Sequence, residues 1–368
     1  MKVLLLAGEE SGVLYAEKIA AEIRRRFPDA QIRGYGDYGF EIGDLAVMGF
    51  GAVLRKIFYF LRVKRTMEKA IRVWKPDAVC TVDYPGMNLK LAAFARRRGV
   101  RAVHVVCPQV WAWKAGRIPG IEAALDSLCC FFPFEPGLFR PGFARFVGHP
   151  LAADFPPSSD LRTEGGGMTV AVLPGSRSGE IERNLPVLLE ACGLLAADRP
   201  GRLKFEIPAA NERALAQIRA IMSAAPRSAA DFSVTLGNAR AVLRRAACAA
   251  VASGTATLEA ALARCPTVLV YRVGALLAWF ARRVIKGIRH VGLANIIAEK
   301  TGLECPMPEL LQENFTAESV AEELGRYVVD DDARRAAIGR LEAVVRELGD
   351  GAGAVAKTVD EIFAFREN

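Results

Sequence analysis

The chain has 368 residues, of which 52% are hydrophobic and 24% are charged, and its formal net charge is +8. This length is comfortable for two domains, and the apolar content excludes an intrinsically disordered protein. The basic balance suits a negatively charged partner, which leaves a nucleic acid, an anionic membrane surface and a phosphorylated substrate as candidates.

The first residues favour a strand over an export signal. The apolar run from Val3 to Ala7 meets Glu9 and Glu10 before a signal-peptide core is complete. No window reaches the roughly 20 uninterrupted apolar residues that a transmembrane helix needs, so we expect a cytoplasmic chain without a membrane span. The eight cysteines form no C-x-x-C motif, which favours buried free thiols over disulfides or metal ligands.

Strand-like and helix-like runs alternate through the first half of the chain. The apolar runs are continuous and are bounded by Gly, Pro and Asp, a pattern typical of parallel strands buried on both faces. The alternation predicts a doubly wound α/β domain. We expect strands at residues 2–7, 31–35, 78–82, 102–106, 127–132 and 146–147, and a helix at residues 13–27.

One segment of the first half has a different pattern. Between residues 50 and 65, large apolar residues fall on one helical arc and basic residues lie opposite, as in a helix that rests on a membrane surface. A core-facing helix with a solvated basic side is the alternative, and a second basic-apolar stretch at residues 276–286 favours the membrane. The expected membrane contacts are Phe50, Ile57, Phe58, Phe60, Leu61, Trp279 and Phe280.

Polar residues follow several of the strands expected in the first half. Asp83 ends the strand at 78–82, where an acid lies over the ligand crevice and can accept a proton from an attacking hydroxyl. A turn-forming Asp near Pro85 is the alternative. Glu9 and Ser11 belong to a weak glycine motif that could bind hydroxyls. Trp111 and Trp113 predict a loop that lines a cleft, whereas His149 reads as a structural residue.

A proline-rich stretch at 155–160 and three glycines at 165–167 predict a linker, after which the alternation restarts. The expected fold is two doubly wound, Rossmann-like domains facing a cleft, at residues 1–157 and 168–339. The helical tail at about 340–368 is a candidate to pack back on the first domain. The second domain is expected to have strands at 169–173, 204–207, 233–236, 247–251 and 267–271.

Two turns in the second half are candidate phosphate sites. Gly175, Ser176 and Arg177 follow the first strand of that half, and the arginine could neutralise a phosphate. The second turn, at residues 253–259, predicts a strand that turns sharply into a helix, with Gly254 relieving crowding and Ser253 capping the first amides. A helix start of this kind attracts anions.

If Thr255 opens that helix, Glu259 lies roughly 6 Å further along the axis, within reach of a ribose attached to a bound diphosphate. An ordinary capped α/β turn with a surface Glu259 is the alternative reading of these residues.

Taken together, these stretches resemble the lipid-A-disaccharide synthase family, inverting glycosyltransferases that join two acylated glucosamine units in lipid A biosynthesis. The tryptophan motif and the order of the series are its most specific parts, and the resemblance runs along nearly the whole chain. It rests on residues 7–9, 11–12, 45–49, 75–77, 83, 85, 88, 108–113, 132–135, 146–150, 173–177, 253–259 and 293–295.

The resemblance implies a GT-B type architecture, with a lipid acceptor on the first domain and a UDP-linked acylated glucosamine on the second. It makes Asp83 the candidate base for the acceptor 6-hydroxyl, and it implies no metal or other cofactor, since a helix dipole and an arginine can stabilise departing UDP. The implied acceptor-binding residues are Glu9, Ser11, Asn88, Trp111 and Trp113. The implied donor-binding residues are Gly175, Ser176, Arg177, Ser253, Gly254, Thr255, Glu259 and Asn295.

The chain departs from the family's pattern beside the expected acceptor site. Val13 and Gly86 stand where acids are usual, and Lys114 replaces an arginine. The expected activity is condensation of UDP-2,3-diacylglucosamine with 2,3-diacylglucosamine 1-phosphate at the inner-membrane surface, with a homodimer left open. The alternatives are another UDP-sugar enzyme of the same architecture, such as an epimerase or a transferase with another acceptor, and a basic nucleic-acid-binding protein. Against the last, no nucleic-acid motif is present.

Overall fold

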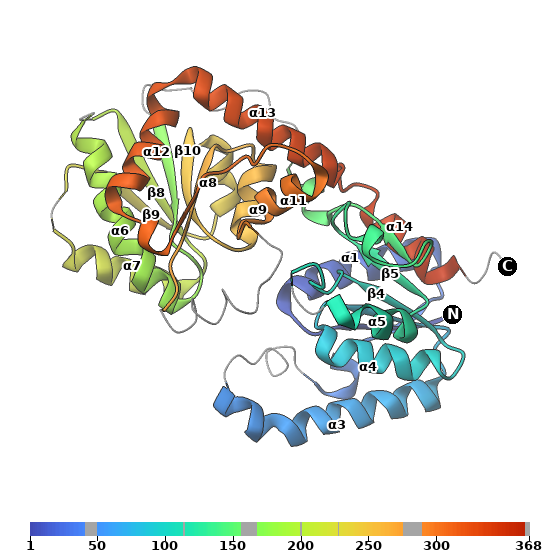
Figure 1. Cartoon of the computed structure of the whole chain (residues 1–368). Helices are drawn as coiled ribbons and strands as arrows, with labels where there is room; N and C mark the ends of the chain where they lie inside the picture. Colours follow the sequence, from blue (N-terminus) through green and yellow to red (C-terminus); the bar gives the residue numbers. More distant parts are fainter. Residues whose placement is uncertain are drawn as a thin grey trace. The chain divides into compact units, whose positions relative to one another are not determined.

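The computed structural model describes residues 1–40, 50–112, 115–155, 168–198, 201–226, 228–274 and 289–364. The chain divides into two compact units, one formed by Met1–Ala153 with Leu348–Asn368 and the other by Asp154–Glu347. In the described residues each unit holds one parallel sheet of six strands with helices on its faces (Figure 1). The expected α/β class with two doubly wound sheets is therefore confirmed.

The first sheet has the strand order β2-β1-β3-β4-β5-β6, and all of its pairings are parallel. Its strands are continuous apolar runs because helices cover both faces. Alternate residues of β1 point to opposite sides, so that Leu5 packs with α1 and Leu6 packs with α3 and α4. The strands are β1 (Lys2–Ala7), β2 (Gln31–Arg33), β3 (Ala78–Val82), β4 (Arg101–Val105), β5 (Ser127–Cys130) and β6 (Ala144–Phe146).

The last helix of the chain packs against the first helix. The Tyr15 and Thr358 hydroxyls are hydrogen-bonded at 2.9 Å, and the rings of Phe27 and Phe363 meet edge to face. The C-terminal residues thus complete the first unit (Figure 1). The helices of this unit are α1 (Glu10–Arg26), α3 (Phe50–Trp74), α4 (Pro85–Arg96), α5 (Ile118–Ala124) and α14 (Ala354–Phe363).

The second sheet has the order β12-β11-β10-β7-β8-β9, again with parallel pairing throughout. Its strands are β7 (Met168–Leu173), β8 (Leu203–Ala209), β9 (Asp231–Leu236), β10 (Cys248–Ala252), β11 (Thr267–Tyr271) and β12 (Glu309–Leu311). Its helices are α6 (Ser178–Ala197), α7 (Glu212–Ala224), α8 (Ala239–Arg245), α9 (Thr255–Leu262), α11 (Leu293–Thr301), α12 (Ala317–Val329) and α13 (Asp331–Leu348). Short 3-10 turns lie at Gly36–Tyr38, Ala115–Arg117, Pro136–Leu138, Pro150–Asp154 and Gln312–Asn314.

The strand order reverses at one place in each sheet, between β1 and β3 in the first and between β7 and β10 in the second. In open α/β sheets, ligands bind outside the carboxyl ends of the strands at such a reversal, because the loops diverge there and leave a crevice. The loops after β1, β3, β7 and β10 are therefore where the fold puts its ligand sites.

Among the described helices, none is both long enough and apolar enough to cross a bilayer. All eight cysteines are free thiols, and seven of them are buried, as the cysteine pattern predicts.

Candidate functional site

A cavity of about 340 Å³ opens at the strand reversal of the second unit. The loops after β7 and β10 form its walls together with the first turn of α9. Seven of the eight residues expected to bind the donor line this cavity: Gly175, Ser176, Arg177, Ser253, Gly254, Thr255 and Glu259. Two sequence motifs that are almost 80 residues apart thus meet in one site.

The start of α9 points its free amides at the cavity. Gly254 is the N-cap, with φ +144°, a backbone conformation that side-chain-bearing residues rarely adopt, and it has no side-chain cap. The expected capping by Ser253 is wrong, because its hydroxyl donates to the Val291 carbonyl at 3.1 Å instead. The uncapped helix start therefore keeps its partial positive charge for an anion.

Glu259 lies one turn into α9 and is held by an arginine that the sequence motifs did not identify. Arg240 donates from Nε to Glu259 Oε1 at 2.8 Å and from Nη1 to Asp154 Oδ2 at 2.9 Å. This support orients the Glu259 carboxylate at the cavity wall. Nothing in the sequence links these three residues, since only the folded chain brings α8 beside α9.

The loop after β7 is organised by Glu180, a second residue missed at the sequence level. Its Oε2 accepts hydrogen bonds from the amides of Ser176 and Arg177, at 3.2 and 3.3 Å. Gly175 has φ +122°, and an added Cβ would come within 2.6 Å of the Glu180 side chain. A carboxylate of the chain itself therefore occupies the amides of this candidate phosphate turn, while the exposed Arg177 guanidinium, which was expected to neutralise a phosphate, pairs with it at 3.3 Å.

Asn295, the eighth expected donor residue, is fully buried and does not line the cavity. Its amide donates to the Met307 carbonyl and to Glu309 Oε1, both at 2.8 Å. Glu309 in turn accepts from the backbone amides of Val291 and Gly292. Asn295 therefore stabilises the turn to which the Ser253 hydroxyl is bonded.

In the first unit, Asp83 stands at the reversal between β1 and β3, as expected for a strand-end acid. Its φ is +51°, as is that of Tyr84, and its Oδ1 accepts from the Tyr84 amide at 2.8 Å. Burial raises the pKa of the Asp83 carboxyl, and the hydrogen bond from Tyr84 offsets part of that shift. The Tyr84 ring packs on Gly8, where a Cβ would come within 2.6 Å of ring atoms.

Asn88 is fully buried beneath Asp83, so its side chain is not part of the protein surface. Its amide nitrogen lies within hydrogen-bonding distance of the carbonyls of Leu6, Val82 and Asp83, the last at 2.7 Å, and its Oδ1 accepts from the Tyr35 hydroxyl. These bonds fix the strained turn that carries Asp83.

The other expected acceptor residues are placed as follows. Glu9 is exposed at the N-cap of α1, and the backbone of Ser11 belongs to that helix. Trp111 is half-buried and donates from its indole nitrogen to Glu135 Oε1 at 3.2 Å, whereas Trp113 lies outside the described residues. His149 stacks on Phe132, and burial lowers its pKa to about 4, which agrees with a structural role.

Comparison with known proteins identifies the family. Residues 3–361 match the family model described as lipid-A-disaccharide synthetase. The chain is also 36% identical over 359 residues to the lipid-A-disaccharide synthase of Burkholderia mallei, which covers 91% of this chain and 89% of that protein.

The chain belongs to the lipid-A-disaccharide synthetase family. It is accordingly a glycosyltransferase of lipid A biosynthesis. Solved structures share the fold: the calicheamicin glycosyltransferase has a TM-score of 0.59 at 16% identity, covering 100% of this chain and 98% of that one. A UDP-GlcNAc 2-epimerase from Neisseria meningitidis, bound to UDP-GlcNAc, has a TM-score of 0.63 at 10% identity and full coverage of both chains.

The two positions where this family member departs from the usual acids differ in their surroundings. Val13 lies in α1 and packs against the core of the first unit. Gly86 is exposed in the first turn of α4, and a Cβ added there would meet nothing within 4 Å. Gly86, which stands where the family usually has an acid, therefore leaves open space beside Asp83, and no packing contact depends on a side chain there.

The predicted membrane helix is α3, which has a core side and an exposed side. Tyr59 and Phe60 are half-buried and pack in part against the core. Phe58 is 79% exposed and Leu61 is 44% exposed. Phe50 is in the helix, but the side chains of Phe50 and Ile57 are outside the described set, as are Trp279 and Phe280 altogether.

Proposed function

We propose that the chain condenses UDP-2,3-diacylglucosamine with 2,3-diacylglucosamine 1-phosphate to give the β-1,6-linked disaccharide 1-phosphate and UDP. The observation that carries the proposal is the cavity of the second unit, where the start of α9, Arg177 and Glu259 meet. Family membership supports the reaction class, and the cavity supplies what a nucleotide diphosphate requires: amides, a cation and a carboxylate.

In the donor site, the diphosphate binds at the amides of Gly254 and Thr255, where the helix dipole favours negative charge. The Ser253 amide is already used, since it donates to the Val270 carbonyl at 3.2 Å. Arg177 approaches the same phosphates from the loop after β7, since it is the exposed cation of the cavity wall. Glu259 accepts hydrogen bonds from the ribose hydroxyls. As the glycosidic bond breaks, the dipole and Arg177 stabilise the charge on the departing UDP, which is the work a divalent ion does in other transferases.

In the acceptor site, Asp83 takes the proton of the 6-hydroxyl as that oxygen attacks the anomeric carbon in a single, inverting displacement. Burial supports this role, because a carboxyl with a raised pKa is a stronger base at neutral pH than an exposed one. We assign Asn88 and Asn295, both buried, as positioning residues. Asn88 donates to the Asp83 carbonyl, whereas Asn295 donates to Glu309, which holds the turn that accepts the Ser253 hydroxyl.

The two units divide these roles, with the acceptor on Met1–Ala153 and Leu348–Asn368 and the donor on Asp154–Glu347. Glu9, Ser11, Trp111 and Trp113 then contribute to the acceptor side. An acylated acceptor must be drawn from a bilayer, and α3 offers a surface for this. Phe58, Leu61, Arg62 and Arg65 are exposed at helical spacing and form a mixed apolar and basic stripe suited to the anionic inner membrane.

The test is to incubate the purified chain with both acylated sugars and to weigh the product. A mass equal to the disaccharide 1-phosphate, with release of one UDP per product, supports the proposal. Turnover on water-soluble sugars alone would reject the lipid acceptor, and conversion of UDP-sugar alone to an isomer of equal mass would favour an epimerase. Tight, salt-sensitive retention of nucleic acid without UDP affinity would favour the remaining alternative. Light scattering of the same sample would test for a homodimer.

A further inference from the structure

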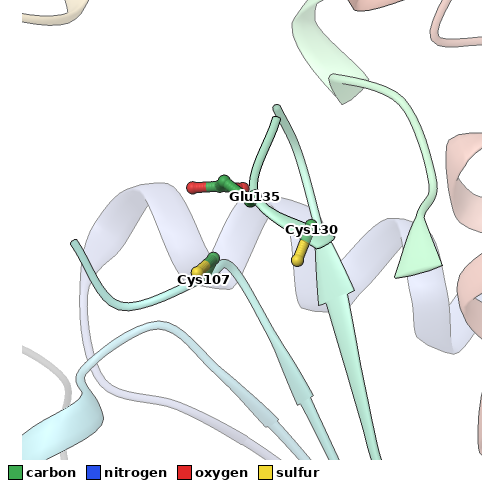
Figure 2. Close-up of side chains that lie close together, drawn as sticks. All are labelled: Cys107, Cys130 and Glu135. Atoms are coloured by element: carbon green, nitrogen blue, oxygen red, sulfur yellow. The ribbon is translucent and has the colours of Figure 1, made fainter. Parts of the chain in front are cut away.

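Two cysteines and a glutamate meet at the carboxyl edge of the first sheet. Cys107 follows β4, Cys130 ends β5, and Glu135 lies in the turn after β5 (Figure 2). One sulfur from each cysteine and one carboxylate oxygen all lie within 4.8 Å of one another. Among the residues that the structure describes, these three form the one group of His, Cys, Asp and Glu side chains that are close enough to share a metal ion.

The three groups are withdrawn from solvent. Cys107 is 4% exposed, Glu135 is 2% exposed and Cys130 is fully buried. Burial raises the pKa of the Glu135 carboxyl to about 8, although its hydrogen bonds lower it. The pKa of Cys130 is raised too, first by its hydrogen bond with Cys107 and then by burial.

Hydrogen bonds hold both oxygens of the Glu135 carboxylate, as is usual for carboxylates that bind metal ions. The Trp111 indole nitrogen donates to one oxygen of Glu135 at 3.2 Å, and the Phe132 amide donates to the other at 3.1 Å. Hydrogen bonds of this kind orient ligating side chains and are a regular part of metal sites. No other buried cysteine of the described chain belongs to a group of three or more side chains that could share a metal ion.

We propose that Cys107, Cys130 and Glu135 bind one zinc-type divalent ion. Two thiolates and one carboxylate match the ligands that zinc accepts, and a tetrahedral site with those bonds places its ligand atoms roughly 3.3–3.8 Å apart. Since the atoms already lie within 4.8 Å, side-chain shifts of about 1 Å would close the site. The fourth position remains open to water.

The ion would have a structural consequence. It would tie the residues after β4, including the Trp111 loop, to the Phe132–Glu135 turn after β5. A bound ion would therefore order the loop that carries the Trp111 motif. The ion itself would take no part in sugar transfer.

The experiment loads the reduced full-length chain with Co²⁺ or Cd²⁺ and measures stoichiometry, absorption and unfolding temperature. We expect one ion per chain, thiolate-to-metal charge-transfer absorption and a higher unfolding temperature. Cys107→Ser and Cys130→Ser should each abolish the charge-transfer band of the site, and Glu135→Gln should weaken metal binding by at least about tenfold. Cys192→Ser, which alters a buried thiol of the second unit, is the matched control and should change nothing.

Two outcomes would overturn the proposal. One is retention of the ion by the Cys107→Ser, Cys130→Ser double variant. The other is a reduced wild-type chain that takes up no Co²⁺ or Cd²⁺. Circular dichroism of each variant establishes that a lost band reflects lost ligands and not an unfolded chain.

Discussion

The sharpest test of the donor site is Glu259→Gln, which removes a charge and leaves the shape of the side chain. In the structure Glu259 Oε1 is taken by Arg240, and the carboxylate lies at the cavity wall. A hydrogen bond to a charged group contributes about 1.5–3 kcal/mol net, so losing the charge at the ribose should weaken UDP binding roughly 10- to 100-fold. Stability should change little, because the Arg240 pair is partly exposed and such pairs contribute about 0–1 kcal/mol.

The assay is calorimetric titration of wild type and Glu259→Gln with UDP and with its 2′,3′-dideoxy analogue. If the carboxylate holds the ribose hydroxyls, the variant loses affinity for UDP but binds the dideoxy analogue as the wild type does. Arg240→Gln is the companion variant, and it should weaken UDP less because the carboxylate remains. An equal loss for both nucleotides would refute the ribose assignment and would locate the effect in the packing of α9.

Four further outcomes are expected. Asp83→Asn should lower turnover about 10²-fold with unchanged UDP affinity, and wild-type turnover would remove Asp83 as the base. Gly86→Asp should raise the free energy of unfolding by about 1 kcal/mol, because the added side chain meets open space at a helix start; a decrease would contradict this. Burial lowers the pKa of His104 to about 3, below its unfolded value near 6.5. The contribution of His104 to the free energy of unfolding is therefore complete above pH 6.5 and is lost as the pH falls. The wild type should therefore lose about 2 kcal/mol at this residue between pH 7 and pH 5, and His104→Leu should flatten the stability profile by that amount in denaturant titrations. Phe58→Ser with Leu61→Ser should release the folded chain from anionic vesicles, whereas persistent sedimentation with vesicles would reject α3 as the membrane contact.

Most strands could be predicted because each is an apolar run with clear breaks. The predictions for β3 and β11 match the structure residue for residue, and the first helix begins three residues earlier than expected. The strand β12 was missed because it has only three residues, all half-buried, and shows no alternation of apolar and polar residues. It lies at the edge of the sheet and pairs with one neighbouring strand only. Edge strands of this kind are fixed by their neighbour and not by their own sequence.

The sequence identified the turns of the candidate site but not the bonds between them. Motif residues are close together in the chain, whereas Glu259 depends on Arg240 from another helix. Asn88 and Asn295 belong to the motifs, but their side chains are bonded within the protein. A polar residue in a motif looks like a ligand contact, but a buried amide with several donors and acceptors also satisfies backbone carbonyls that would otherwise be orphaned. Asn88 and Asn295 are used in this second way.

The charges around the donor cavity also separate the two arginines by role. Arg240 is paired with two carboxylates and lies against the ring of Phe155, so moving it would break several contacts. Arg177 is 67% exposed and, among the described residues, its one ion pair is with Glu180 at 3.3 Å. An exposed pair contributes at most about 1 kcal/mol, so a diphosphate with greater charge can displace Glu180 as the partner of Arg177 at little cost. Because Glu180 keeps the Ser176 and Arg177 amides, the loop retains its shape during that exchange. In the donor site proposed above, Arg177 is therefore the cation free to move onto the phosphates, and Arg240 is the fixed support that keeps Glu259 in place for the ribose.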